Sequence, residues 1–165
     1  MAGIRTVPAH AAVATRLLAA GLVVAALDFL YVLVRWVWLE HALTVQELAQ
    51  SIATGLLGRA AYDGGIRTAV LGLLLHLGVA CGWTLVFFVV TARVPAFRAM
   101  VATVRGRVLA GLLWGPIVWL LMDFVVLPLS RARPTPTTSP TFYVNLVQHA
   151  LMIGMPMSLL LGARR

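Results

Sequence analysis

The chain has 165 residues, of which 61% are hydrophobic and only 11% are charged. Globular domains carry about 25% charged residues, and a chain this short lacks the interior volume to hide so much apolar surface, so the composition excludes a water-soluble globular protein. We expect one compact transmembrane unit that spans residues 1–165.

The charge balance is basic, with a net charge of +8, and all 13 basic residues are arginines. They lie in short flanks of apolar segments, which indicates membrane topology and anionic lipid headgroups rather than nucleic acid. The absence of lysine is typical of a GC-rich bacterial genome. The single cysteine, Cys81, cannot form an internal disulfide and is expected to be a small buried hydrophobe.

Four apolar stretches predict four membrane-spanning helices. The first, at about residues 13–34, is longer than a signal-peptide core and ends at arginine and tryptophan rather than a cleavage site, so we expect it to be retained. The others are expected at about 66–92, 108–129 and 142–161, each long enough to cross a hydrocarbon core of about 30 Å. Pro116 and Pro156 predict kinks. The predicted fold is an all-α bundle of four transmembrane helices.

Arginine counting predicts the orientation of the bundle. One side holds eight arginines, which are Arg5, Arg16, Arg93, Arg98, Arg105, Arg107, Arg164 and Arg165. The other side holds five, namely Arg35, Arg59, Arg67, Arg131 and Arg133, and also carries Glu40, Glu47 and Asp63. Because arginine accumulates on the cytoplasmic side, we expect both termini in the cytoplasm of a bacterial inner-membrane protein.

The loop after the first span predicts a short amphipathic helix at about residues 44–57. Thr44 and Glu47 have the spacing of a capping box, and apolar residues then recur at helical spacing. Gly55 and Gly58 are the expected stops. This helix either covers the outer face of the bundle or is a plain connector that rests on lipid. The second outer loop, residues 130–140, is rich in Pro, Thr and Ser and is expected to be irregular, with a helix starting at Ser139-Pro140.

Each span carries one ionisable residue near its middle: Asp28, His76, Asp123 and His149. Placing a charged group in hydrocarbon costs about 2.5 to 3.5 kcal/mol on insertion scales, so such residues usually face the bundle interior. With spans of alternating direction, all four lie about 4 to 6 Å to the outer side of the midplane. We expect them to converge, with the aspartate-bearing helices on one diagonal and the histidine-bearing helices on the other. Asn145 lies one turn before His149 and is expected to support the site.

Three interpretations of this polar layer stay open. Hydrogen bonds between Asp and His can simply hold the helices together. Alternatively, Asp28, His76, Asp123 and His149 bind a divalent transition metal or exchange protons. In the third interpretation, His76 and His149 hold a non-covalent haem b, with room for the ring at Gly72. The leading functional hypothesis is ion, proton or cofactor binding, and the alternative is an accessory or assembly subunit of a larger membrane complex.

Two glycine pairs have the spacing that allows close helix approach, Gly78 with Gly82 and Gly111 with Gly115. Gly78 and Gly82 lie opposite His76 on their helix, so their face is expected to meet another subunit, a neighbouring helix or lipid. The chain has no nucleophile elbow, phosphate loop, zinc-protease helix or paired-cysteine motif. We therefore predict no catalytic residues.

Three stretches carry a resemblance to a known family: the sequence from Ser51 to Ala61 followed by Gly64-Gly65, the sequence from Leu71 to His76, and Pro128-Leu-Ser130. They resemble an uncharacterised group of small bacterial four-helix inner-membrane proteins that are YagU-like in layout. The resemblance covers most of the chain from Leu17 onward. It implies the architecture and the inner-membrane location and supplies no catalytic residue.

Overall fold

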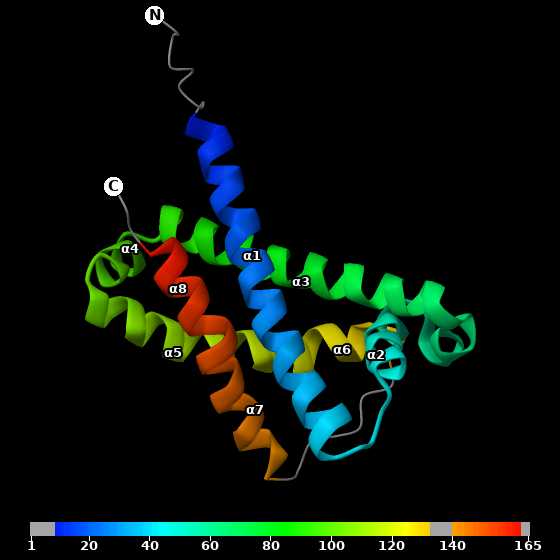
Figure 1. Ribbon diagram of the computed structural model, residues 1–165. Helices are drawn as coiled ribbons and strands as arrows, with labels where there is room; N and C mark the ends of the chain where they lie inside the picture. Colours follow the sequence, from blue (N-terminus) through cyan, green and yellow to red (C-terminus); the bar gives the residue numbers. More distant parts are fainter. Residues whose placement is uncertain (1–8, 133–139, 163–165) are drawn as a thin grey trace, which may run out of the picture.

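The computed structural model describes residues 9–132 and 140–162, and every regular element in these ranges is helical (Figure 1). Four helical stretches are long and apolar enough to cross a membrane, at Ala11–Leu39, Val45–Arg93, Val104–Leu129 and Thr141–Leu161. The protein is thus an all-α, multi-pass membrane protein, as the composition predicts. The ends of the helices reach beyond the predicted apolar ranges because a helix continues into the charged flanks where its backbone is still hydrogen-bonded.

The elements follow one another along the chain with short connections. They are α1 (Ala9–Leu33), η1 (Val34–Leu39), α2 (Val45–Leu57), η2 (Gly58–Gly64), α3 (Gly65–Arg93), α4 (Pro95–Val101), α5 (Val104–Leu121), η3 (Met122–Val126), α6 (Leu127–Leu129), α7 (Thr141–His149), η4 (Ala150–Gly154) and α8 (Met155–Leu161). The segments η1, η3 and η4 are π-helical and η2 is a 3-10 helix. Each π-helical segment continues a spanning helix, so the spans remain unbroken.

The packing order of the spans places the two aspartate-bearing helices on one diagonal. Helix α1 packs against α3 on one side and against α8 on the other, and α8 packs in turn against α5 (Figure 1). The short helix α4 bridges α3 and α5. The sequence did not reveal α4, although Pro95 at its first turn is a usual helix start.

An aromatic cluster forms part of the core where α3, α4 and α5 meet. The rings of Phe87, Phe97 and Trp114 contact one another, with Phe87 and Trp114 edge to face at 5.2 Å between centroids. Val101 and Met157 are fully buried against this group. This aromatic cluster closes the interior of the bundle at the arginine-rich end, where α1 begins and α8 ends.

The glycine pair of α5 allows the close helix contact that its spacing predicts. A Cβ atom at Gly115 would overlap the main chain at His149 and Ala150, and one at Gly111 would come within 2.7 Å of the Cα atom of Met155. Around Gly78 and Gly82, by contrast, an added Cβ would meet nothing within 4 Å. The first pair therefore packs inside the molecule, and the second lies on an open face of α3.

Helix α2 begins with the predicted capping box and packs against α3. The hydroxyl of Thr44 accepts from the backbone N–H of Glu47 at 3.2 Å, and the Glu47 carboxylate accepts from the N–H of Thr44 at 2.8 Å. The helix ends at Leu57, because Gly58 has a φ of 64° that other residues rarely adopt. Gly55, the other expected stop, lies within the helix.

The polar anchor of α2 is Gln50, which sequence reasoning did not single out. Its side chain is 1% exposed, and its amide nitrogen lies 3.0 Å from the carbonyl oxygen of Gly65 and 3.1 Å from the hydroxyl of Thr68. A backbone hydrogen bond from Arg131 to the carbonyl of Gly55 ties α2 to the segment after α6. Helix α2 is therefore a packed part of the bundle rather than a connector resting on lipid.

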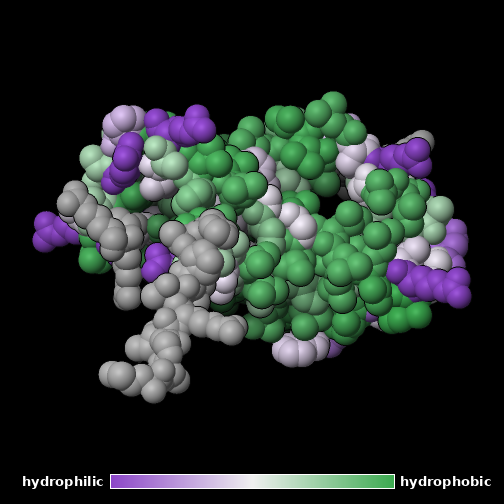
Figure 2. Space-filling view, turned by 90° about the horizontal axis from the view of Figure 1, so that it is seen from above, coloured by the Kyte–Doolittle hydropathy of each residue, from purple (hydrophilic) through white to green (hydrophobic). Residues whose placement is uncertain are grey.

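The surface agrees with a bilayer environment. Figure 2 shows hydrophobic residues covering the middle of one face and hydrophilic residues gathered toward its two ends. Large apolar side chains stay exposed on every span, among them Leu22, Leu74, Leu113 and Val147. Extensive apolar surface of this kind between polar ends suits lipid acyl chains. Residues 133–139, which include most of the loop predicted to be irregular and Ser139, lie outside the described ranges; Pro140 directly precedes α7.

Candidate functional site

The structure brings together the four ionisable residues that the sequence singles out. A cavity of about 240 Å³ between the spans is lined by Asp28 of α1, His76 of α3, Asp123 of η3 and His149 of α7. All four side chains are half-buried. The rest of the wall is apolar or aromatic, formed by Val24, Val79, Ala80, Trp83, Val118, Trp119, Met122, Leu127 and Ile153. The cavity is a small site in which four ionisable side chains lie among hydrophobic walls.

His76 is held between α1 and α3 by a main-chain hydrogen bond. Its Nε2 atom lies 3.0 Å from the carbonyl oxygen of Ala25 and 3.9 Å from Oδ2 of Asp28. A carbonyl oxygen only accepts, so Nε2 carries the hydrogen and donates. The ring also contacts Phe29 at 5.7 Å between centroids. The other ring nitrogen, Nδ1, is then the position at which His76 takes a second proton.

Asp28 is bound by a residue that sequence reasoning missed. The side-chain amide of Gln148 donates to Oδ1 of Asp28 at 2.7 Å, and Gln148 is 5% exposed. This bond joins α1 to α7 across the middle of the bundle. The sequence does hold a signal for this residue: a glutamine inside an apolar span carries an amide group that is costly to leave unpaired in hydrocarbon.

His149 is oriented along its own helix. Its Nδ1 atom donates to the carbonyl oxygen of Asn145 at 2.9 Å, which leaves Nε2 as its second protonation site. The side chain of Asn145 does not line the cavity; its Oδ1 atom accepts from Arg35 at 3.4 Å. Asn145 thus supports His149 through its main chain and Arg35 through its side chain.

The helical geometry changes at the cavity. Asp123 lies in the π-helical segment η3, and η4 begins directly after His149. Each segment precedes a proline, Pro128 or Pro156, and a proline leaves the carbonyl four residues earlier without its α-helical donor. The fourth span thus changes its helical form before Pro156, where a kink was predicted, whereas α5 remains one continuous helix through Pro116. Widened turns of this kind are frequent at functional sites.

The cavity differs in its two directions along the bundle. One end of the bundle, which we call the loop end, is where η1 connects to α2. There the side chain of Asn145 accepts a hydrogen bond from Arg35, and Nε of Arg35 donates to the exposed carboxylate of Glu40 at 2.9 Å. Toward the arginine-rich end, the floor of Val24, Val118 and Ile153 is buried and joins the aromatic cluster of Phe87, Phe97 and Trp114. Hydrogen-bonded polar groups therefore extend from His149 toward the loop end, and apolar residues lie on the side of the arginine-rich end.

The four residues do not form a ready metal site. Within residues 9–132 and 140–162, no three side chains of the His, Cys, Asp and Glu types are close enough together to hold a metal ion. Oxygen and nitrogen ligands must lie within about 2.0 to 2.2 Å of a zinc ion, so the cavity would have to contract around it. Metal binding by Asp28, His76, Asp123 and His149 stays a prediction without geometric support.

The cavity does not suit a haem either. Its volume of about 240 Å³ is below the range of roughly 300 to 1,000 Å³ that small-molecule sites have. The room expected at Gly72 is filled by α2, because a Cβ atom at Gly72 would overlap the carbonyl of Ala49. The Nε2 atom of His76 is committed to Ala25. The space that His76 and His149 line is large enough for waters or a small solute and too small for a haem.

Comparisons with family models, with curated proteins and with solved structures find no match to this chain. What can be said of the protein therefore comes from its own residues. It is a multi-pass membrane protein in which four ionisable side chains, one from each span, share a single interior cavity.

Proposed function

We propose that this protein binds and exchanges protons at the central cavity, with Asp28, His76 and His149 as the groups that titrate and Asp123 as the second carboxylate. The observation that carries the proposal is the convergence of all four residues on one cavity. Ionisable groups within a membrane are rare and usually mark ion or proton pathways, because each costs free energy to insert.

The hydrogen bonds of the two imidazoles support this function. Each ring donates one N–H to a fixed main-chain carbonyl, Ala25 for His76 and Asn145 for His149. A ring held in this way keeps its orientation while its second nitrogen gains or loses a proton. Asp28 offers the nearby negative charge, since its Oδ2 lies 3.9 Å from His76.

The direction of access follows from the polar groups around the cavity. Asn145, Arg35 and Glu40 lead from His149 to the loop end, and the aromatic cluster closes the other end. With both termini in the cytoplasm of a bacterial inner membrane, as arginine counting predicts, the cavity exchanges protons with the external side. We include that orientation in the proposal.

The test is a pH titration by NMR of protein with ¹⁵N-labelled histidine in detergent micelles, between about pH 5 and pH 8. The ¹⁵N signals of His76 and His149 are expected to report proton binding, and Asp28→Asn is expected to change this response because a neighbouring charge is lost. The exposed His41, in the loop after η1, is the internal reference and Asp63→Asn the matched control variant. The signals of His41 should not change in Asp28→Asn, and the signals of His76 and His149 should not change in Asp63→Asn.

Two results contradict the proposal. Histidines of the cavity that keep one protonation state over the whole range would mean that the layer only holds helices together. A stoichiometric divalent metal in the purified protein, lost in Asp123→Asn, would mean a metal site instead.

The second candidate function is that of an accessory subunit in a larger membrane complex or a homo-oligomer. It is favoured by the open face of α3, where Gly78 and Gly82 are exposed and an added Cβ would meet nothing within 4 Å. Close approach of another helix at such a face contributes packing free energy in lipid. Gly82→Leu should then reduce the mass of the assembly measured in mild detergent, and an unchanged mass contradicts this candidate.

A further inference from the structure

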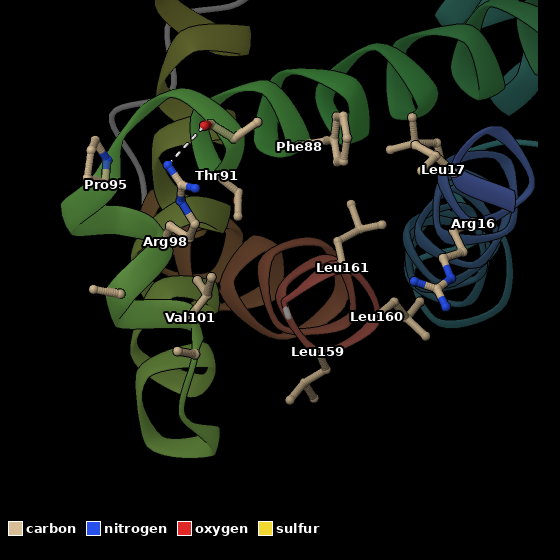
Figure 3. A pocket seen from close by; sticks show the side chains of 14 residues that line it. Arg16, Leu17, Phe88, Thr91, Pro95, Arg98, Val101, Leu159, Leu160 and Leu161 are labelled. Atoms are coloured by element: carbon tan, nitrogen blue, oxygen red, sulfur yellow. Dashed lines mark hydrogen bonds between the residues drawn. The ribbon is translucent and has the colours of Figure 1, made fainter. Parts of the chain in front are cut away.

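A second and larger cavity lies at the arginine-rich end of the bundle, apart from the central one. It has a volume of about 800 Å³ and is formed by α1, α3, α4 and α8 (Figure 3). None of its lining residues lines the central cavity. We call it the terminal groove.

The walls of the terminal groove are apolar. Figure 3 shows Phe88 of α3 and Leu161 of α8 pointing into the space from opposite sides, with Leu17 of α1 beside it. Thr91, a polar lining residue, donates its hydroxyl hydrogen to the carbonyl of Phe87 in its own helix at 2.9 Å. The interior of the groove therefore offers contact surface to a hydrocarbon chain and few hydrogen-bonding groups.

Two arginines flank this apolar space. Arg16 of α1 and Arg98 of α4 lie on opposite sides of the groove in Figure 3, and both are exposed. Arg98 donates one hydrogen bond, from Nη2 to the carbonyl of Ala92 at 3.3 Å, and a guanidinium has five N–H donors. Most donors of Arg98 thus stay available to an anion at the mouth of the groove.

No acidic residue offsets this charge. The five acidic residues of the chain are Asp28, Glu40, Glu47, Asp63 and Asp123, so none lies in the stretches that build the arginine-rich end. Arg93, Arg105 and Arg107 add to the positive field there. Arg16 and Arg98 at the rim of an apolar groove that no acidic side chain lines match a ligand with an anionic head and a hydrocarbon tail.

We propose that the terminal groove binds an anionic phospholipid, with its headgroup at the rim that carries Arg16 and Arg98 and an acyl chain against Leu17, Phe88 and Leu161. The groove is continuous with the apolar surface, because Val13, Leu159 and Leu160 line it and are exposed to the bilayer. A water-soluble phosphate compound would leave these walls uncovered, so a lipid of the adjoining leaflet fits both the charge and the shape. This inference does not depend on proton binding at the central cavity.

The test is native mass spectrometry of delipidated protein titrated with phosphatidylglycerol or with zwitterionic phosphatidylcholine. The wild-type protein is expected to retain phosphatidylglycerol at least about tenfold better than phosphatidylcholine, since each arginine near the headgroups contributes several-fold. The double variant Arg16→Gln/Arg98→Gln should lose this preference. Arg105→Gln, which removes an exposed arginine of the same end outside the groove, should keep it.

A second variant tests the groove without changing any charge. Ala102 lines the groove and is exposed, so Ala102→Trp fills the space without disturbing the core and should abolish retention of phosphatidylglycerol. Equal retention of both lipids, a loss as large in Arg105→Gln as in the double variant, or a dimer that covers the groove would each overturn the proposal. If the double variant does not fold, the result with Ala102→Trp decides.

Discussion

Gln148 shows how a single neutral side chain organises the centre of the molecule. Its amide donates to Asp28 at 2.7 Å, and the neighbouring residue along α7 is His149. One residue thus fixes the carboxylate that faces His76 and couples α1 to the helix that carries the other imidazole. Hydrogen bonds between membrane helices contribute only about 0.6 kcal/mol on average, but a bond to a charged group is stronger.

Replacing Gln148 by Leu should reduce stability, because Asp28 then loses its buried donor. We expect a loss of about 1 to 3 kcal/mol, seen as a lower midpoint of thermal unfolding in detergent. The stability of the Gln148→Glu variant should depend on pH. Two adjacent carboxyl groups repel when both are ionised, so this variant gains stability as the pH falls. Val147→Ala, at an exposed position of the same helix, is the control. Equal midpoints for Gln148→Leu and the control would contradict the role given to this bond.

Between elements, the close contact of α5 with the fourth span positions His149. Gly111 and Gly115 leave no room for side chains, and the main chain that they touch includes the carbonyl of His149. The shape of the central cavity therefore depends on how closely α5 approaches the fourth span. Asp123 lies in the π-helical segment η3, and His149 directly precedes η4. A small shift of the third span against the fourth therefore changes the distance between Asp123 and His149.

Gly115→Ala tests this contact. The added methyl group overlaps the main chain at His149 and Ala150, so we expect a net loss of about 1 to 3 kcal/mol in stability and an altered titration of His149. Gly82→Ala is the matched control, because its methyl group meets nothing within 4 Å and alanine favours the helix. Circular dichroism during heating gives the stability. A Gly115→Ala protein as stable as Gly82→Ala would show that the helices do not pack as closely as the structure has them.

At the scale of the whole molecule, charge is distributed unequally over the two ends. The end where α1 begins and α8 ends has arginines and no acid, whereas Glu40, Glu47 and Asp63 all lie at the loop end. The same asymmetry appears in the interior, with an apolar core at the arginine-rich end and polar groups toward the loop end. The positive-inside rule applied to the arginines predicts that the loop end lies outside the cell.

Labelling with a membrane-impermeant maleimide checks this orientation. In a Cys81→Ala background, Asp63→Cys in η2 should react in intact cells, and Arg105→Cys in α5 should react only after lysis. Both positions are exposed, so accessibility within the protein does not limit the reaction. The reverse pattern would show that the bundle is inserted the other way and that the cavity opens toward the cytoplasm.

The sequence by itself determined the class of protein, its four spans, the capped helix between the first two spans and the four ionisable residues that line the cavity. These features depend on local hydropathy, cap chemistry and the cost of ionisable groups in lipid, which a single chain displays without its partners. Helix α4 was not predicted because seven residues are too few to display a helical period.

Only the tertiary structure decided which groups touch. The bond of Gln148 to Asp28, the anchor of Gln50 under α2, and the closure of the space at Gly72 all join residues from different elements. Such contacts depend on how the helices rotate and approach one another in three dimensions, and hydropathy does not encode distance between segments. The same reason explains why Asp28, His76, Asp123 and His149 share a cavity yet lie too far apart to form a ready metal site.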